Sequence, residues 1–292
     1  MSENEQELNN LKDQVSTIKR EVDALQIEIL SSKKPWYRQV TTIIAIGALL
    51  FSFGTTIVAY YRTSTQDLLA SRTELRSLLS ELSTIPEQHF QMQKNYQDEP
   101  QISSELSAQF NTRNLRLSKQ AAAVIERIEK SLFGKGTVLS VEYVAVAAGL
   151  GTSFQHEEAM KHHKIAASRD NDPTTAAGIL RSIAGMELIN ANADGARKFM
   201  QKARQIFSDS RFRSVDQLTM DATNATTEVQ WSFLELQLGE CNLAQEQKEK
   251  AELLISQLPK GSFKTNLLGL IDERTAQFDS CTASFSPPQQ AQ

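Results

Sequence analysis

The apolar positions of this chain are most concentrated in residues 40–61, a run without a single charged residue. As a helix, these 22 residues rise about 33 Å at about 1.5 Å per residue, enough to cross a hydrocarbon layer of roughly 30 Å. The Thr and Ser hydroxyls of the run can bond back to helix carbonyls, so no donor needs to face lipid without an acceptor. The pattern predicts one transmembrane helix in the bilayer, and residues 34–62 form this segment with its flanks.

Both ends of the run carry residue types that anchor helices at a membrane surface. These aromatic and cationic residues are Lys33, Lys34, Trp36, Tyr37, Arg38, Tyr60, Tyr61 and Arg62. A cleaved signal peptide is the main alternative, but the 39 residues before the run and the length of the run itself disfavour it. A buried core helix is a second alternative, which the absence of charge throughout the run disfavours.

Residues 1–33 form a polar segment in which apolar residues recur at alternating spacings of three and four. The seven members of this seam are Leu8, Leu11, Val15, Ile18, Val22, Leu25 and Ile29. This 3.5-residue period is that of a left-handed coiled coil, and β-branched residues at a with Leu at d favour two parallel strands. We therefore expect self-association as a parallel dimer. An amphipathic helix that packs on another protein or lies on the bilayer is the alternative.

After the membrane, apolar residues at heptad-like spacing predict a helical stalk over residues 63–86, which Pro86 should end. The polar, Gln-rich stretch 87–102 predicts a linker. Ser103 and Ser104 then offer caps for a further helix, which the Gly-Lys-Gly sequence at 134–136 should end. That triplet lacks the spacing of a phosphate-binding loop.

From residue 137 onward the pattern is that of successive helices, and strand signals are almost absent. The predicted helices are 138–154, 156–169, 174–189, 194–207, 216–238, 243–258 and 263–278. The sequences at 171–173 and 192–195 combine Asn, Asp, Pro and Gly, which are stop-and-start signals between short antiparallel helices. The predicted fold class is all-α, with one helical domain over 103–280 and a disordered tail at 281–292.

The alanine pattern of these helices resembles the tetratricopeptide repeat (TPR). That family has a paired-helix unit of about 34 residues, with a small residue, a bulky residue and Ala at fixed spacing on the second helix. Residues 138–208 carry the two best repeats. Their second-helix positions are Ala159, His163 and Ala166, then Ala196, Met200 and Ala203. Their first-helix positions are Tyr143, Val146, Ala147 and Leu150, then Leu180, Ile183 and Ala184.

A third unit, with Trp231 on its first helix and Ala244 and Ala251 on its second, departs further from the pattern. Lys248 lies there at the position where a bulky apolar residue is expected. The resemblance implies an α-solenoid of TPR-like helical hairpins whose concave surface holds an unidentified protein or peptide partner. An unrelated helical bundle is the alternative.

Composition and local motifs narrow the classes of function. The chain has 292 residues and a formal net charge of −4, which gives no electrostatic basis for nucleic-acid binding. His156, His162 and His163 lie close together, but the sequence HEEAM lacks the HExxH spacing of a zinc site, so we expect no bound metal. Neither a Gly-x-Ser-x-Gly elbow nor a Cys with His nearby in sequence is present. We expect no catalytic residue and no cofactor.

The charges beside the run predict the orientation of the chain in the membrane. Three cations precede the run within eight residues, whereas one lies equally close after it. The positive-inside rule therefore favours a cytoplasmic N-terminus and a C-terminal domain in the periplasm or another extracytoplasmic space, as in a protein of the bacterial inner membrane. In such an oxidising space Cys241 and Cys281, the two cysteines of the chain, can form one disulfide.

Three functions are compatible with these patterns. The first is a single-pass, membrane-anchored, self-associating scaffold whose helical domain binds a protein partner. The second is a membrane-tethered sensor or assembly subunit that signals through its coiled coils. The third is an enzyme with a helical site that no motif reveals.

Overall fold

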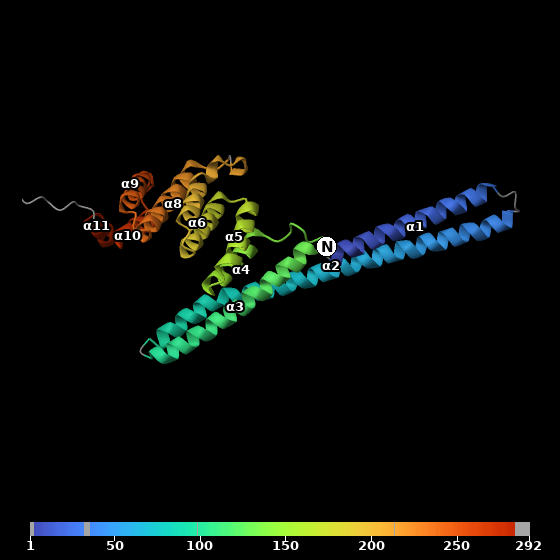
Figure 1. Ribbon diagram of the computed structural model, residues 1–292, viewed down its shortest axis with the longest axis horizontal. Helices are drawn as coiled ribbons and strands as arrows, with labels where there is room; N and C mark the ends of the chain where they lie inside the picture. Colours follow the sequence, from blue (N-terminus) through green and yellow to red (C-terminus); the bar gives the residue numbers. More distant parts are fainter. Residues whose placement is uncertain (1–2, 32–35, 98, 213, 284–292) are drawn as a thin grey trace, which may run out of the picture. The chain divides into compact units, whose positions relative to one another are not determined.

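The computed structural model describes residues 3–31, 36–97, 99–212 and 214–283, and all regular structure in these ranges is helical (Figure 1). The α-helices are α1 (Glu3–Ser31), α2 (Trp36–Asn95), α3 (Pro100–Lys130), α4 (Ser140–Thr152), α5 (His156–Arg169), α6 (Pro173–Ile189), α7 (Ala193–Arg204), α8 (Gln217–Gln237), α9 (Cys241–Gln257), α10 (Ser262–Asp272) and α11 (Thr275–Ala283). Two 3₁₀ turns, η1 (Ile206–Ser208) and η2 (Ser210–Phe212), lie between α7 and α8. The predicted all-helical fold is confirmed for these ranges.

The chain divides into two compact units. Unit 1 comprises Met1–Ser77 and Ala123–Val138, and unit 2 comprises Leu78–Ala122 and Leu139–Gln292. The divisions fall inside α2 and α3, whereas the sequence suggested a division at the linker 87–102. Because α3 pairs with α2, each unit holds a part of both helices.

Helix α2 continues through Pro86, where the sequence predicted the end of the stalk. Proline removes one helical hydrogen bond and normally kinks or breaks a helix. Pro86 itself is exposed, whereas Leu82, Ile85 and Met92 on either side of it are buried. Burial of these apolar side chains on one face offsets the lost bond, so the helix reaches Asn95.

The predicted linker 87–102 is for the most part helical. Only the turn between Asn95 and Pro100 separates α2 from α3, and α3 begins three residues earlier than the predicted serine caps. Proline suits the first turn of a helix, because its missing N–H would have no helical acceptor there. In the turn, the Glu99 N–H donates to the Tyr96 carbonyl over 3.0 Å.

Polar contacts join α2 to α3 within each unit. In unit 2, Arg113 Nη2 lies 2.7 Å from Glu81 Oε1, and in unit 1 Arg127 Nη1 lies 3.0 Å from Glu74 Oε2. All four side chains are partly exposed, so these pairs contribute little to stability and mainly fix the alignment of the two helices.

Asn114 on α3 links this helix to α4 within unit 2. Its Nδ2 donates to the Gly149 carbonyl over 3.0 Å and to Thr152 Oγ1 over 2.6 Å. The two helices approach closely at Gly149, where a Cβ would lie 2.1 Å from Ser118 Oγ and would force that side chain to move.

Six helices of unit 2 follow one another as three successive pairs, α4 with α5, α6 with α7 and α8 with α9. Their starts follow the predicted signals, because the side chains of Asp172 and Asn192 accept hydrogen bonds from backbone N–H groups at the first turns of α6 and α7. The predicted helix 263–278 is in fact two helices, α10 and α11, separated by a turn at Glu273 and Arg274. Residues 281–283 of the predicted tail belong to α11, and the rest of that tail lies outside the described residues.

Two apolar clusters form the core of the later pairs. One consists of Ala184, Ala196, Met200, Trp231 and Leu234, between α6, α7 and α8. The other consists of Ala225, Val229, Ala251, Ile255, Leu258, Leu267 and Ile271, between α8, α9 and α10. The side chains that remain on the surface of these helices are therefore the candidates for function.

Candidate interaction surface

The residues identified as repeat-packing positions lie inside the paired helices. All ten are buried: Tyr143, Ala147, Ala159, His163, Ala166, Leu180, Ala184, Ala196, Met200 and Ala203. Ala244 and Ala251 of the third pair are also fully buried. Lys248, at the position where the repeat pattern predicts a bulky apolar residue, places its Nζ 5.3 Å from the centre of the Phe278 ring on α11. The same spacing of small residues therefore packs all three pairs.

On α4 and α6, the first helices of the first two pairs, the side chains that are not buried form a stripe along one side of each helix. On α4 the stripe consists of Val141, Val144, Ala145 and Ala148, which are exposed or half-buried. On α6 the positions 37 residues later are Gly178, Arg181, Ser182 and Gly185, of which Ser182 is exposed and the other three are half-buried. The α4 stripe is apolar, whereas the α6 stripe places one long cation among small residues. We call the α6 stripe the arginine stripe.

Arg181 is the polar centre of the arginine stripe. Its Nη1 donates to Thr227 Oγ1 on α8 over 3.0 Å, and its Nε is buried without a hydrogen-bond partner in the described part of the chain. Burial lowers the pKa of the Arg181 guanidinium to about 10. No residue of the described ranges forms an ion pair with it within 4.0 Å. A guanidinium that is desolvated and not neutralised is suited to an anionic group from outside the chain.

Threonines on α8 support Arg181 from one side. Thr227 Oγ1 donates to the Thr223 carbonyl over 2.8 Å, so its remaining lone pair is available to accept from Arg181. Thr223 Oγ1 lies 3.5 Å from Thr174 Oγ1 at the start of α6. This support holds the guanidinium at the α6–α8 boundary without neutralising its charge.

Two ion pairs between α7 and α8, in which the carboxylates are buried and the guanidinium groups are partly exposed, were not predicted from the sequence. The Arg197 guanidinium donates to both carboxylate oxygens of Glu235, with 2.7 Å as the shortest distance, and Arg204 Nη2 donates to Glu228 Oε2 over 2.6 Å. Trp231 lies between the pairs, because its Nε1 donates to Glu235 over 2.8 Å and its ring centre is 4.2 Å from the Arg204 guanidinium. We call this set the α7–α8 ladder. Seven-residue spacing of Arg on α7 and Glu on α8 was the signal for it in the sequence.

A shallow hollow of about 350 Å³ opens beside one end of the ladder. It is lined by Arg204, Asn224, Glu228, Lys250, Leu253 and Leu254. The Asn224 Oδ1 atom is buried without a hydrogen-bond partner in the described residues. The two charged ladder residues are already paired with each other, so the arginine stripe remains the stronger candidate for recognising a charged ligand.

The three histidines of α5 do not assemble a metal site. Among the described residues, no group of three His, Cys, Asp or Glu side chains has the geometry to hold a metal ion. His163 is buried, and burial together with the neighbouring His162 lowers its pKa to about 4. The His162 ring packs on Tyr143 with centroids 5.8 Å apart. Both histidines therefore serve as neutral packing residues at ordinary pH.

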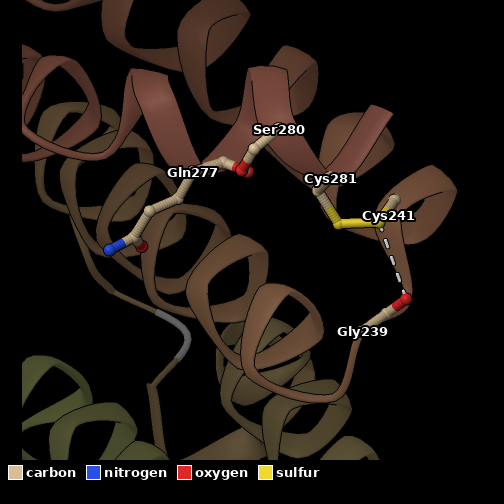
Figure 2. Close-up of a disulfide and its surroundings, with 5 residues drawn as sticks. All are labelled: Gly239, Cys241, Gln277, Ser280 and Cys281. Carbon is tan, nitrogen blue, oxygen red and sulfur yellow. Dashed lines mark hydrogen bonds between the residues drawn. A yellow bond between two sulfur atoms is a disulfide. The ribbon is translucent and has the colours of Figure 1, made fainter. Parts of the chain in front are cut away.

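Cys241 and Cys281 are joined in a disulfide that ties α11 to the start of α9 (Figure 2). Their Cα atoms lie 5.4 Å apart, within the usual range for a disulfide. Figure 2 shows Gln277 and Ser280 on the same helix as Cys281, with Gly239 in the turn before Cys241. The bond closes a segment of 40 residues and fastens the last helix to the third pair.

The predicted coiled-coil seam lies on α1. Within the described side chains, Val15 is exposed and Ile18, Val22 and Leu25 are half-buried. The side chains of Leu8, Leu11 and Ile29 lie outside the described residues. Apolar seam residues that keep accessible surface in a single chain are available to a second copy.

The apolar run lies in the first half of α2. Among the described helices, α2 is the one that is long and apolar enough to cross a membrane. No residue in its most apolar stretch is buried within the structure. Phe51, Val58 and Tyr61 are among its exposed side chains. Lys33 and Lys34, two of the cations on which the predicted orientation depends, lie outside the described residues.

The chain has few recognisable similarities to known proteins. No family model and no curated protein matches it. Among solved structures, BtubC (BKLC) from P. vanneervenii resembles it with 13% sequence identity and a TM-score of 0.40, over 74% of this chain and 95% of that chain. A similarity this low supports no argument about fold or function.

Proposed function

We propose that this protein is a single-pass, membrane-anchored, self-associating scaffold. In this proposal the apolar run of α2 spans the bilayer, α1 forms a parallel coiled coil with a second copy, and the paired helices form a TPR-like domain. That domain binds a protein or peptide partner. The orientation we propose places α1 in the cytoplasm and the paired helices in the periplasm or another extracytoplasmic space, where the Cys241–Cys281 disulfide is stable.

The observation that carries the binding role is the unpaired guanidinium of Arg181. A protein seldom keeps a desolvated cation without a carboxylate partner, because the desolvation penalty is then not offset. A partner peptide with an Asp or Glu side chain, or a free C-terminal carboxylate, would supply the missing acceptor. The apolar stripe of α4, with Val141 and Val144, would then receive an apolar side chain of the same peptide.

A peptide array tests this binding role directly. The full chain in lipid nanodiscs is applied to peptides that differ only by Asp against Asn or Glu against Gln. We expect the chain to retain acidic members and to lose them in the Arg181→Met variant. Lys161→Met removes the same charge from an exposed, paired position on α5 and serves as the control. Equal retention by the parent chain and Arg181→Met, or no preference for acid over amide, would refute the role of the arginine stripe.

The self-association is tested at the seam. Val22→Lys places a charge on the seam and should convert the full chain in detergent from a dimer to a monomer by sedimentation analysis. Ile27→Lys makes the same change at an exposed position of α1 outside the seam and should leave the dimer intact. A parent chain that is already monomeric, or equal effects of both variants, would contradict the coiled coil.

The sensor alternative is favoured by one feature, the continuity of α2. This helix runs without interruption from the apolar run to its pairing with α3. A continuous helix can transmit a change in the paired helices to the other side of the bilayer. Cross-linking between copies through a cysteine introduced at Val15, with and without a bound peptide from the array, distinguishes a signalling subunit from a static scaffold. A cross-linking yield that does not respond to the peptide would leave only the scaffold.

A further inference from the structure

The turn between α3 and α4 presents two adjacent large apolar side chains to solvent. Leu132 is 51% exposed and Phe133 is 38% exposed, and Lys135 follows them on the same turn. Consecutive apolar residues at the tip of a turn do not contribute to a core, so their surface remains available to a partner. The sequence singled out this segment only for its Gly-Lys-Gly helix stop.

The same turn lies at the end of the apolar run of α2. The ring of Phe133 packs against that of Tyr61, with centroids 5.5 Å apart. Tyr61 is the last residue of the run, its neighbour Tyr60 contacts it edge-on, and Arg62 follows. Both contacting segments belong to unit 1, where α3 returns along α2 (Figure 1).

Several bonds hold the turn in this position. Arg72 Nη2 on α2 donates to Thr137 Oγ1 over 2.7 Å, and Thr137 Oγ1 donates to the Gly134 carbonyl over 2.6 Å. The Gly136 N–H donates to Glu129 Oε2 over 3.0 Å, and Gly136 adopts a φ of 76°, which favours glycine. The exposed apolar pair is therefore presented by a fixed turn whose polar backbone is largely satisfied within unit 1.

We propose that this turn is a second membrane contact, in which Leu132 and Phe133 enter the interfacial layer of the same bilayer that α2 crosses. Tyr60, Tyr61 and Phe133 then form one aromatic group at the level of the headgroups. Aromatic rings favour that layer because they combine an apolar body with a polar or polarisable edge. The cation of Lys135 lies at the lipid phosphates together with Arg62, which also follows the aromatic edge.

The bilayer is the occupant that the structure favours over a protein partner. The exposed pair is continuous, through the Phe133–Tyr61 contact, with the edge of the segment that passes through the lipid. This inference rests on the membrane anchor of the proposed function. Its consequence is that α2 and the end of α3 in unit 1 are attached at two points, which restricts the tilt of α2.

Quenching of tryptophan emission by brominated lipid tests the inference in the full chain. Three variants are reconstituted separately into bilayers with brominated acyl chains: Leu132→Trp, Leu69→Trp and Phe51→Trp. The parent chain, which carries Trp36 and Trp231, gives the baseline that is subtracted. Leu69 is also exposed on α2, but it lies eight residues beyond Tyr61, about 12 Å further along the helix.

We expect the added emission to be quenched at 51 and at 132 but not at 69. Quenching at 51 without quenching at 132 would overturn the second contact and leave the anchor intact. Burial of Leu132 against a second copy of the chain would give this result, because it would shield the residue from lipid. Absence of quenching at 51 would refute the anchor itself. Quenching at 69 as well as 132 would also overturn the inference, since it would place the whole segment in lipid.

Discussion

Buried polar groups have hydrogen-bond partners at the α7–α8 interface, whereas some on α5 and α6, the helices that precede it in the chain, have none among the described residues. In the α7–α8 ladder each buried carboxylate is bound by a guanidinium, and the Trp231 N–H has its acceptor in Glu235. On α5 and α6, by contrast, His163 Nδ1 and Arg181 Nε are buried without a hydrogen-bond partner in the described residues. The two regions adjoin within unit 2, so the difference does not come from their general environment.

The contrast distinguishes paired buried side chains, which stabilise the fold, from unpaired buried side chains, which do not. A buried ion pair fixes the geometry of the helices that carry it, and its loss leaves a charge without compensation. An unpaired buried group lowers stability in the free protein and needs a different explanation. For His163 the explanation is volume, since it fills a packing position, and for Arg181 it is the proposed partner carboxylate.

The largest predicted effect is at the ladder. Glu235→Ala should lower the free energy of unfolding by about 3–5 kcal/mol, because it empties a buried site and leaves the Trp231 N–H without an acceptor. Among the described residues, Arg197 would keep the exposed Glu240 at 3.6 Å as its one ion-pair partner. Urea denaturation of the detergent-solubilised chain, monitored by far-ultraviolet circular dichroism, measures the change.

Glu126→Ala is the matched control for this variant, because it also removes a glutamate from an ion pair, but at an exposed site on α3 in unit 1, whereas the ladder belongs to unit 2. It should leave the urea midpoint unchanged. An equal shift of the midpoint in both variants would show that the ladder pair contributes no more to the free energy of unfolding than a surface pair does. The proposed difference between the two regions would then be wrong.

Reduction of the disulfide should have the next largest effect. The Cys241–Cys281 bond closes a 40-residue segment, and its loss should cost about 2–4 kcal/mol in the free energy of unfolding. Because the bond holds α9, which supplies Gln247 as a second acceptor for Arg204 at 2.7 Å, reduction should also weaken the effect of ladder variants. Urea midpoints with and without a phosphine reductant measure both effects.

A Cys241→Ser and Cys281→Ser double variant should match the reduced parent chain and should not respond to reductant. If protein from native membranes carries two freely alkylated thiols before reduction, the extracytoplasmic orientation is wrong, even if the disulfide forms in purified protein.

A pH titration should reveal the unpaired histidine. The pKa of His163 is lowered to about 4 by burial and by His162, against about 6.5 in an unfolded chain. Between these values the unfolded chain binds a proton that the folded chain does not. Stability is therefore complete above about pH 6.5 and falls by up to about 1.4 kcal/mol per pH unit as the pH decreases toward 4.

His163→Met tests the origin of this slope, because Met200 occupies the corresponding position of the second pair. The variant should keep the fold at pH 7 and lose a large part of the acid sensitivity, with the remainder due to His162, whose pKa is also lowered by burial. An unchanged slope in His163→Met would assign the acid sensitivity to other groups.

The smallest predicted effect, and the one of opposite sign, is at the arginine stripe. Arg181→Met should leave the free energy of unfolding unchanged or raise it by up to about 1 kcal/mol, because it removes a desolvated charge and only one hydrogen bond, to Thr227. Arg204→Met, by comparison, should destabilise the fold, since Glu228 and Gln247 both lose their partner. A large loss of stability in Arg181→Met would identify Arg181 as a structural residue and weaken the binding proposal.

Much of the fold follows from periodicity, because helices with one buried face repeat their apolar positions regularly. The helix at 156–169 was predicted with the bounds that α5 has, and the alanines of the second helices are the fully buried positions. Pro86 was misjudged because a local rule about proline does not include the buried Leu82 and Ile85 beside it. Tertiary packing decides such a position, and a single sequence does not display it.

The candidate site was less accessible to sequence reasoning. Arg181 is one of several arginines in the chain, and its lack of a partner depends on where the carboxylates of other helices lie. The same holds for Phe133, whose contact with Tyr61 joins segments more than seventy residues apart in sequence. Residue type and spacing predict what a helix face is made of, but not which faces meet.

The spacing of the ion pairs in the α7–α8 ladder also sets the alignment of the two helices. Its arginines are seven residues apart on one helix and its glutamates are seven residues apart on the other, so both pairs can form together in one alignment. A shift of α8 by one helical turn would break both pairs at once and leave four charges facing apolar neighbours such as Trp231. The ladder thus fixes the axial alignment of α8 of the third pair against α7 of the second pair. It disfavours neighbouring alignments that apolar packing alone would tolerate.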